Sequence, residues 1–421
     1  MRLTDSWISD SHLQTVLHSL SDAGHQALLV GGCVRNGLLR EPIDDIDIAT
    51  DALPQRVIEI MEAAGLRTVP TGVDHGTVTV IACGKPHEVT TFRRDIETDG
   101  RRAKVAFSEA IHEDAARRDF TMNALYADAD GRIIDPLEGL ADLRARRVRF
   151  VGAPEARIQE DYLRILRFFR FHARYGDQTE GLDKEGLAAC ATLSAGIETL
   201  SKERVGHEMR KLLAAHDPAP AVAAMAQAGV LARILPGATI QPLGPLIHLE
   251  GTLTPDPIRR LAAIGGVDPA AQLKLSRAEE KHLSQVIANA GSLSGPAELA
   301  YRFGAKLALD IMLVRAAAIG QQLPLNYAVK LKKGAEARFP VRAADLPSFS
   351  GSALGARLKE LEERWIDSDF ELSREQLLSS ILAHALPEPK KLYGLGTDSS
   401  FNDALTRIWN EFVTLAGLPS K

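Results

Sequence analysis

LLVGGCVR (residues 28–35) and DIDIAT (residues 45–50) are the two short stretches that decide the fold of this chain. The first opens with an apolar run closed by two glycines, which predicts a buried strand that ends in a tight turn. A short helix is expected from Arg35 to Leu39. The glycines, Gly31 and Gly32, and the free N–H groups at the start of this helix suit an anionic ligand. A glycine pair alone is most often only a turn.

The second stretch places two aspartates inside an apolar strand. Because strand side chains alternate between faces, Asp45 and Asp47 point the same way, about 6.7 Å apart along the strand. Two carboxylates on one face are costly unless a cation neutralises them, and Mg²⁺ binds carboxylates together with substrate phosphates. A lone pair of this kind is otherwise a solvated strand end or a turn. In combination, the turn, Arg35 and the paired acids favour a metal-dependent nucleotide site.

The order of these residues also carries a resemblance. Gly-Gly-x-Val-Arg-x-x-Leu-Leu followed by Asp-x-Asp-x-Ala-Thr resembles the nucleotidyltransferase head of class II tRNA nucleotidyltransferases (CCA-adding enzymes) and of bacterial poly(A) polymerases. The chain departs from that pattern at Asn36, where the family usually has Asp, so a hydrogen-bonding side chain is kept but its charge is lost. The resemblance implies that Mg²⁺ is held by Asp45 and Asp47, and that phosphates are cradled by Gly31, Gly32 and Arg35.

Composition sets the broad class. A chain of 421 residues is too long for one compact core, so two to four domains are expected. Its hydrophobic content of 45% and mean hydropathy of −0.07 are typical of a soluble globular protein. The sequence contains no apolar run of about 18 residues, so no membrane span is predicted. Three widely spaced cysteines without a Cys-x-x-Cys pattern argue for a reducing cytoplasm and against structural zinc.

The net charge of −5 hides a basic segment. Between Arg144 and Arg174 the sequence has nine arginines against three acids. Because phosphate binding depends on the local field, this segment suits nucleic acid even in an acidic protein. The alternative is a solvated helical face, although such a face normally mixes charges of both signs.

The N-terminal third alternates helical and strand patterns. Apolar spacing predicts helices over Ser11–Leu20 and Leu53–Gly65, and alternation predicts strands over Thr77–Ala82 and His87–Phe92. Without regular βαβ spacing, we expect an α+β fold: a head with a small mixed β-sheet and helices, followed by all-α neck, body and tail domains. The polar segment 93–105 is expected to be a loop, either closing over the nucleotide or a plain surface connection.

Glu88 lies on the second of these strands. A third acid in a two-metal site often helps to hold the metals or the attacking oxygen. Glu88 is therefore a catalytic candidate, and its alternative is a solvent-facing strand residue.

Paired arginines precede an acid and an apolar segment in Arg117-Arg118-Asp119-Phe120-Thr121. Arginine binds phosphate or ribose oxygens through its fork of donors, and a surface ion pair is the alternative. The run resembles the family's Arg-Arg-Asp-Phe-Thr motif. By that resemblance Arg118 contacts the nucleotide, and Asp119 orders the arginine or a ribose hydroxyl.

A helical apolar stripe runs through residues 160–171. Asp161, Arg164 and Arg167 are spaced by three, so one helix face is expected to carry them, with Arg170 continuing the row. These side chains either hold a triphosphate or present acceptor and donor edges to a base. The family uses its Glu-Asp-x-x-Arg motif as a protein template, which implies that Asp161 and Arg164 admit CTP and ATP and reject UTP and GTP.

The distal part of the chain is helical and poor in motifs. We expect a catalytic head over 1–145, a neck with the base-recognition helix over 146–215, a body over 216–335, and a tail over 336–421 that binds tRNA. Basic residues there either follow a tRNA backbone or are solvated: Lys330, Lys332, Lys333, Arg338, Arg342, Lys390 and Lys391.

The resemblance implies Mg²⁺-dependent, template-independent addition of CMP, CMP and AMP from CTP and ATP to the 3′ end of tRNA. The expected partner is the tRNA acceptor arm. Poly(A) polymerase, or an enzyme adding only CC or only A, shares the same motifs. A reading of a different class is a non-catalytic RNA-binding protein on a nucleotidyltransferase fold.

Overall fold

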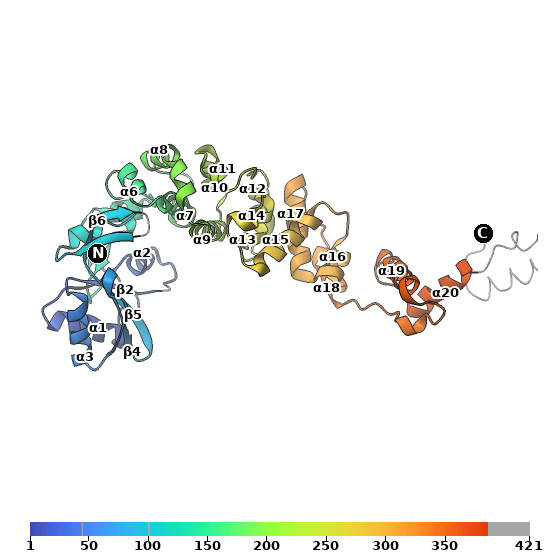
Figure 1. The fold of residues 1–421 in the computed structure, drawn as a ribbon, viewed down its shortest axis with the longest axis horizontal. Helices are drawn as coiled ribbons and strands as arrows, with labels where there is room; N and C mark the ends of the chain where they lie inside the picture. Colours follow the sequence, from blue (N-terminus) through green and yellow to red (C-terminus); the bar gives the residue numbers. More distant parts are fainter. Residues whose placement is uncertain (44, 100–101, 386–421) are drawn as a thin grey trace, which may run out of the picture. The chain divides into compact units, whose positions relative to one another are not determined.

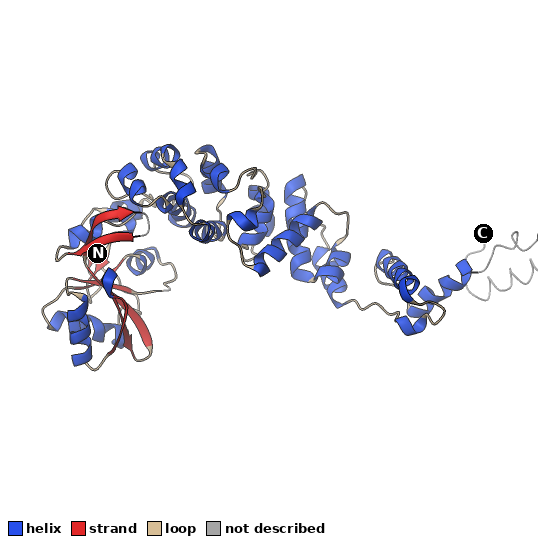
Figure 2. Cartoon of the chain, in the orientation of Figure 1, coloured by secondary structure: helices blue, strands red, loops and turns tan. Residues whose placement is uncertain are grey.

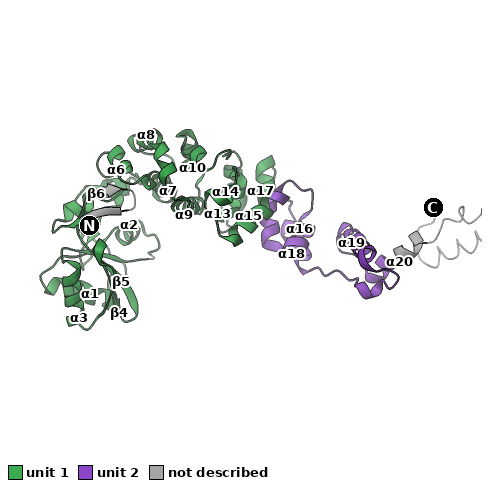
Figure 3. Cartoon of the chain, viewed as in Figure 1, with its two compact units in different colours: residues 1–287, 313–322 green, residues 288–312, 323–421 purple. Residues whose placement is uncertain are grey.

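The computed structural model describes residues 1–43, 45–99 and 102–385 (Figure 1). The chain forms two compact units (Figure 3). The first comprises Met1–Ile287 and Leu313–Gln322, and the second comprises Ala288–Met312 and Leu323–Lys421, of which 386–421 lie outside the described part. The four-domain division from the sequence stays a prediction, and Lys390 and Lys391 are not among the described residues.

A mixed sheet of seven strands forms the centre of the N-terminal region (Figure 2). Its order is β3-β4-β5-β2-β1-β8-β9, in which β2 and β5 pair in parallel and the other neighbours are antiparallel. This confirms the predicted small mixed sheet. The strands are β1 (Ala27–Val30), β2 (Asp47–Thr50), β3 (Arg67–Gly72), β4 (Thr77–Ala82), β5 (Lys85–Thr91), β8 (Tyr126–Ala127) and β9 (Ile133–Ile134).

Three helices attach to this sheet. α1 (Ser11–Asp22) begins at Asp10, whose carboxylate accepts the His12 N–H, and it packs with α3 (Pro54–Ala63) against β4. The apolar stripe predicted for α1 is buried. α2 (Gly32–Leu39) starts three residues before the predicted Arg35, because Gly31 turns the chain at φ 71° directly after β1.

The segment expected to be a loop is instead a hairpin. β6 (Arg93–Asp99) pairs with β7 (Arg102–Phe107) as a separate two-stranded ribbon. The prediction was wrong because it judged the segment by its polar composition. Backbone pairing needs only N–H and C=O groups, so polar residues do not prevent it.

The remainder of the described chain is helical, as the predicted fold class requires. The helices are α4 (Ile111–Ala116), α5 (Gly139–Arg144), α6 (Pro154–Glu160), α7 (Leu163–Tyr175), α8 (Lys184–Thr192), α9 (Lys202–Leu213), α10 (Ala219–Gln227), α11 (Val230–Ile234), α12 (Leu243–Glu250), α13 (Pro257–Ile264), α14 (Pro269–Gln272), α15 (Arg277–Ala290), α16 (Pro296–Phe303), α17 (Ala305–Ile319), α18 (Tyr327–Glu336), α19 (Gly351–Asp367) and α20 (Arg374–Ala385). Short 3₁₀ turns are η1 (Val73–His75), η2 (Thr121–Asn123), η3 (Ser194–Thr199) and η4 (Ala343–Asp345). No helix in the described ranges is long and apolar enough to cross a membrane.

The helix predicted over residues 160–171 is broken. The segment divides at Asp161, which is extended (φ −155°, ψ 106°) between α6 and α7. This break matters for function because it removes Asp161 from the helix face that carries Arg164.

Aromatic side chains join α7 to the sheet region. Phe168 stacks on Phe150 with ring centroids 5.3 Å apart, and Phe120 lies 4.9 Å from Phe171. All four rings are buried. Such pairs contribute about 0.5–1.5 kcal/mol each beyond their area burial, so α7 is fixed firmly to the segment that carries Arg118.

A buried arginine secures the end of α9. Arg260 is 1% exposed and donates to Leu213 O (2.7 Å), in the last residue of α9, and to His216 O (3.1 Å), just beyond that helix. Its Nη2 also donates to Glu250 Oε2 at 2.7 Å, and Arg259 binds the other oxygen of that carboxylate at 2.7 Å. Arg260 thus satisfies backbone acceptors that the helix end leaves unpaired.

Replacing this arginine tests its contribution. We expect Arg260→Met to lower the free energy of unfolding by about 3 kcal/mol, because it leaves buried carbonyls and part of the Glu250 charge unpaired. Chemical denaturation measures the change. Arg56→Met, at an exposed i,i+3 ion pair on α3, is the control and should change it by about 0.5 kcal/mol or less. Equal effects of the two substitutions would contradict the assignment.

Candidate active site

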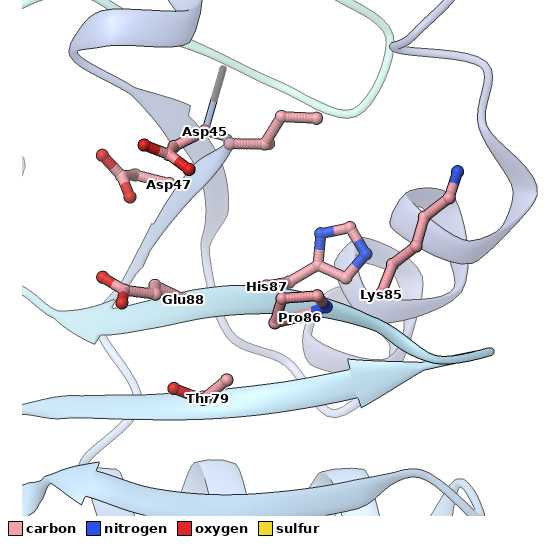
Figure 4. Close-up of a pocket in the computed structure, with 8 residues that line it drawn as sticks. Asp45, Asp47, Thr79, Lys85, Pro86, His87 and Glu88 are labelled. Atoms are coloured by element: carbon pink, nitrogen blue, oxygen red, sulfur yellow. The ribbon is translucent and has the colours of Figure 1, made fainter. Parts of the chain in front are cut away.

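Three acidic side chains meet where the start of β2 lies beside the middle of β5 (Figure 4). The parallel register sets Asp47 opposite Glu88, and Asp45 precedes β2 by two residues. All three line one pocket of about 480 Å³, together with Ile46, Thr79, Lys85, Pro86 and His87. The structure therefore brings together the predicted acidic pair and the third candidate acid.

The electrostatics of the pocket suit a hard cation. Burial raises the pKa of Asp47, and the charges of Glu88 and Asp45 raise it further, against the opposing charge of Arg118. Carboxylate oxygens are ligands that Mg²⁺ prefers, and a bound cation would relieve this repulsion. Within the described part of the chain no three His, Cys, Asp or Glu side chains form a metal-binding group, and Asp45 and Asp47 stay the predicted metal ligands.

The predicted glycine turn lies on the next strand. Gly31 ends β1, which pairs with β2. A Cβ built on Gly31 would lie 3.1 Å from Nη1 of Arg118, so glycine lets the guanidinium approach the turn closely. Gly32 follows as the first residue of α2. The turn and Arg118 together form a cationic group on the β1 side of the acids.

Arg118 is held in place by two residues that the sequence analysis missed. Its Nη2 binds Asp114 Oδ2 at 3.0 Å, and its Nε donates to the Tyr126 hydroxyl at 3.2 Å. Tyr126 in turn donates to Asp114 Oδ2 at 2.6 Å. Burial alone lowers the pKa of the guanidinium, but Tyr126 and Asp114 outweigh it and raise that pKa above its usual value. The i,i+4 spacing of Asp114 and Arg118 was the available signal.

Asp119 has a different partner from the predicted one. Its Oδ2 accepts from Arg167 Nε at 2.8 Å, while its Oδ1 accepts from the amide of Asn123 at 2.8 Å and from the Phe120 N–H at 2.9 Å. The expectation that Asp119 orders Arg118 is therefore wrong, because Asp114 on the preceding helix pairs with Arg118 instead, while the alternative that Asp119 binds a ribose hydroxyl stays a prediction. Asp119 instead links the head segment to α7.

Arg35 is buried and points toward α7. Its Nε and Nη2 donate to Asn36 Oδ1 at 3.0 and 2.8 Å, and Nη2 also donates to the Tyr175 hydroxyl at 2.8 Å. Its Nη1 donates to Asn123 Oδ1. The amide of Asn36 donates to Pro42 O at 2.6 Å. Neither Arg35 nor Asn36 lines the acidic pocket, and Asn36 orients Arg35.

The residues predicted to read the base lie around the break between α6 and α7. Asp161 accepts the Leu163 N–H on Oδ1 (3.1 Å) and Arg204 Nη2 on Oδ2 (2.6 Å). Arg164 Nη1 binds Glu160 at 2.5 Å and Arg157 O at 2.9 Å. Arg204, on α9, is a further residue that the sequence analysis did not assign to this site.

Comparisons with known proteins place the chain. Residues 27–149 match the family described as Poly A polymerase head domain, and residues 181–240 match the one described as probable RNA and SrmB-binding site of polymerase A. The mitochondrial CCA tRNA nucleotidyltransferase 1 of Mus musculus is 32% identical over 388 residues, which is 88% of this chain and 89% of that protein. The chain belongs to the CCA tRNA nucleotidyltransferase family.

Other members of the family are similar in sequence and structure. The CCA-adding enzyme of Streptococcus gordonii is 44% identical over 202 residues, covering 48% of this chain and 49% of that protein. The crystal structure of the Bacillus stearothermophilus CCA-adding enzyme in complex with CTP aligns with a TM-score of 0.67 at 27% identity, covering 89% of this chain and 97% of that one. The Thermotoga maritima CCA-adding enzyme complexed with tRNA shares the fold, with a TM-score of 0.68 at 19% identity over 91% and 97% of the two chains.

The arginines of α7 were expected to form one row on one face of the helix, but they pair with carboxylates on different parts of the chain. Arg167 binds Asp119 in the head segment, while Arg170 binds Glu208 on α9 at 2.5 Å. Each step of three residues rotates the side chain by about 60° short of a full turn, so the row drifts around the helix. Arg170 is 9% exposed and supports α7 from the side of α9.

The Asp119–Arg167 pair makes stability depend on pH. Burial acts to raise the pKa of Asp119, but Arg167 and the Asn123 amide outweigh it and lower the pKa to about 2 from 3.8. The unfolded chain therefore binds more protons between these values, so the stabilisation is complete above about pH 4 and is lost as pH falls through 2.

We expect Asp119→Asn to lower the free energy of unfolding by about 2 kcal/mol at pH 7. The difference from the unsubstituted protein should shrink as the pH falls below about 4, which urea denaturation from pH 7 to pH 3 measures. A difference that stays constant over this range would contradict the lowered pKa.

Proposed function

We propose that this chain adds CMP, CMP and AMP, from CTP and ATP, to the 3′ end of tRNA. Membership of the family supports this reaction, and one geometric observation carries it. Three carboxylates share a pocket on β2 and β5, while Arg118 lies fixed beside the Gly31 turn on the neighbouring strand β1. This arrangement joins an acidic centre to an anion-binding group.

Asp45 and Asp47 are the residues proposed to hold Mg²⁺. When bound, the metal lowers the pKa of the attacking 3′-hydroxyl and neutralises charge on the triphosphate and pyrophosphate. Glu88, directly opposite Asp47, is proposed to accept a hydrogen bond from that hydroxyl. On the β1 side of the acids, the phosphate oxygens of the nucleotide are bound by the N–H groups at the start of α2 and by the guanidinium of Arg118.

Asp161 and Arg164 are proposed to select the base. The carboxylate of Asp161 accepts from the exocyclic amine that C and A share, and Arg164 donates to a ring nitrogen or carbonyl. UTP and GTP lack that amine at the same edge, so they lose this charge-assisted hydrogen bond, which is worth about 1.5–3 kcal/mol. Arg204 and Glu160 hold the two side chains in place through the ion pairs described above.

The tRNA acceptor arm is proposed to be recognised by shape and phosphate contacts, because A-form RNA offers little major-groove readout. Among the distal basic residues, Lys333 pairs with Asp369 and Glu371, and Lys332 pairs with Glu336. Cytoplasmic location stays a prediction, based on cysteines that are free in the structure.

Nucleotide incorporation tests the proposal. Labelled NTPs are offered singly and in pairs, with Mg²⁺, to tRNA transcripts ending before CCA, after C and after CC. We expect two C additions, one A addition and then a stop. A long A tail would favour a poly(A) polymerase, the name carried by the matched head-domain family. Incorporation from no NTP would favour the non-catalytic RNA-binding protein.

Asp45→Ala tests the acidic centre. We expect it to abolish incorporation while leaving tRNA affinity, measured by filter binding, nearly unchanged, because the proposed shape and phosphate contacts with the acceptor arm do not involve this carboxylate. Asp22→Ala, at an exposed position at the end of α1, is the matched control and should retain activity. Activity retained in Asp45→Ala would remove the metal assignment.

Asp114→Asn tests the support of Arg118. Loss of the charged partner should raise KM for ATP and CTP about tenfold, because charge-assisted hydrogen bonds are about twice as strong as neutral ones. Tyr126→Phe removes one hydroxyl and should act in the same direction but less. Glu113→Gln, at a neighbouring acid with a longer ion pair (3.6 Å) to Arg94, is the control. Unchanged nucleotide KM in folded Asp114→Asn would contradict this role.

A further inference from the structure

The short turn η3 lies against the residues proposed to read the base. It contacts α7 and ends two residues before Ser201, the cap of α9. Tyr162, between Asp161 and the first residue of α7, packs on Gly196 in the middle of this turn. A Cβ built on Gly196 would lie 2.0 Å from ring carbons Cδ1 and Cε1 of Tyr162 and 2.4 Å from Cγ. The ring therefore rests directly on the glycine backbone.

Glycine is required here by the ring and not by the backbone conformation. Gly196 lies inside a 3₁₀ turn and is not one of the glycines with positive φ, so alanine can adopt its backbone angles. Real Cβ atoms essentially never lie closer than 3.0 Å to such neighbours, so an alanine would push the ring away. Among the described glycines, no other comes so close to another residue's side chain.

The turn that carries Gly196 is itself held in place. Arg233 on α11 donates from Nε to Ser194 Oγ at 3.2 Å, and its Nη1 binds Glu198. Ser194 is 6% exposed and Ile197 is 4% exposed. Residues on both sides of Gly196 are thus anchored, and the turn cannot easily retreat from the tyrosine ring.

The start of α9 holds the neighbouring carboxylate. Arg204 Nη2 binds Asp161 Oδ2 at 2.6 Å, and the Ser201 hydroxyl accepts the Arg204 N–H at 3.4 Å. Two adjacent residues, Asp161 and Tyr162, are therefore both attached to the segment 194–204. Because consecutive Cα atoms are linked at about 3.8 Å, the ring contact of Tyr162 also limits the position of Asp161.

We propose that Gly196 and Tyr162 are positioning residues for base selection, which rests on the proposed function and deepens it. The ring packed on η3 fixes the break between α6 and α7, and so holds the Asp161 carboxylate where it accepts from the exocyclic amine of C or A. CTP and ATP lose that hydrogen bond when the carboxylate moves, whereas UTP and GTP do not use it. Displacing the ring therefore lowers the discrimination between nucleotides.

Gly196→Ala tests this role. Incorporation of CTP and of UTP is measured separately on a tRNA transcript that ends before CCA. We expect kcat/KM for CTP to fall about tenfold, the value of one hydrogen bond, and kcat/KM for UTP and KM for tRNA to change by about twofold or less. A purely structural effect would reduce the active fraction and so lower the incorporation of both nucleotides equally, leaving the CTP-to-UTP ratio unchanged.

Substitutions of Tyr162 test the same contact from its other side. Within the described part of the chain the Tyr162 hydroxyl has no hydrogen-bond partner, so the conservative variant Tyr162→Phe keeps the ring and should retain the CTP-to-UTP ratio. Tyr162→Ala removes the ring and should lower the ratio as Gly196→Ala does. In the double variant Gly196→Ala/Tyr162→Ala the added methyl group no longer meets a ring, so the two losses should not add. Additive losses would contradict the contact.

Controls separate this role from loss of fold and from failure of the proposed function. Gly244→Ala on α12 is the matched control, because a Cβ there meets no atom within 4 Å, and thermal unfolding reports on folding. If the unsubstituted protein incorporates no nucleotide, the proposed function fails. If it incorporates CMP and folded Gly196→Ala keeps the ratio, only the role of Gly196 and Tyr162 is overturned. If Gly196→Ala does not fold, equal ratios for Tyr162→Ala and Tyr162→Phe overturn it.

Discussion

The parallel pairing of β2 with β5 is the constraint on which the catalytic region depends. It sets Asp47 directly beside Glu88, close to Asp45, and so concentrates negative charge in one partly buried pocket. Burial and these neighbours raise the pKa of Asp47, which shows the cost of the arrangement in the absence of a cation. The opposite charge lies next to the flanking strand β1, where Arg118 approaches the Gly31 turn. The order of the strands therefore sets on which side of Asp47 the acids and the cation lie.

Short-range patterns in the sequence were sufficient to predict several of the elements around the β2–β5 pair. The Gly31 turn and the helix predicted over Ser11–Leu20 are each determined by neighbouring residues, and the structure contains both. The strand predicted to include Asp45 begins two residues later, at Asp47. The hairpin over residues 93–107 was not predictable in the same way, because strand pairing satisfies backbone groups whatever the side-chain polarity. The break at Asp161 was missed because its carboxylate accepts the Leu163 N–H, which starts a new helix in place of continuing the old one.

Residue types at the site were predicted better than their partners. Arg118 and Asp119 are adjacent in sequence, which suggested that one orders the other. In the fold they diverge, since Arg118 binds Asp114 on the preceding helix and Asp119 binds Arg167, 48 positions away. Such long-range pairs depend on how α7 packs against the head through its aromatic rings. Periodicity alone contains no information about that packing.

The ion pairs around the base-reading residues still allow a base to bind. Each carboxylate oxygen has two lone pairs, and Asp161 uses one on Oδ1 for Leu163 and one on Oδ2 for Arg204, so it retains acceptor capacity. Arg164 has five N–H donors, of which its contacts with Glu160 and backbone carbonyls use only part. Both groups are therefore fixed before a nucleotide arrives. A base with a mismatched edge would then meet a rigid acceptor and donor that do not rotate to suit it, and this rigidity supports the proposal that these two side chains act as a template.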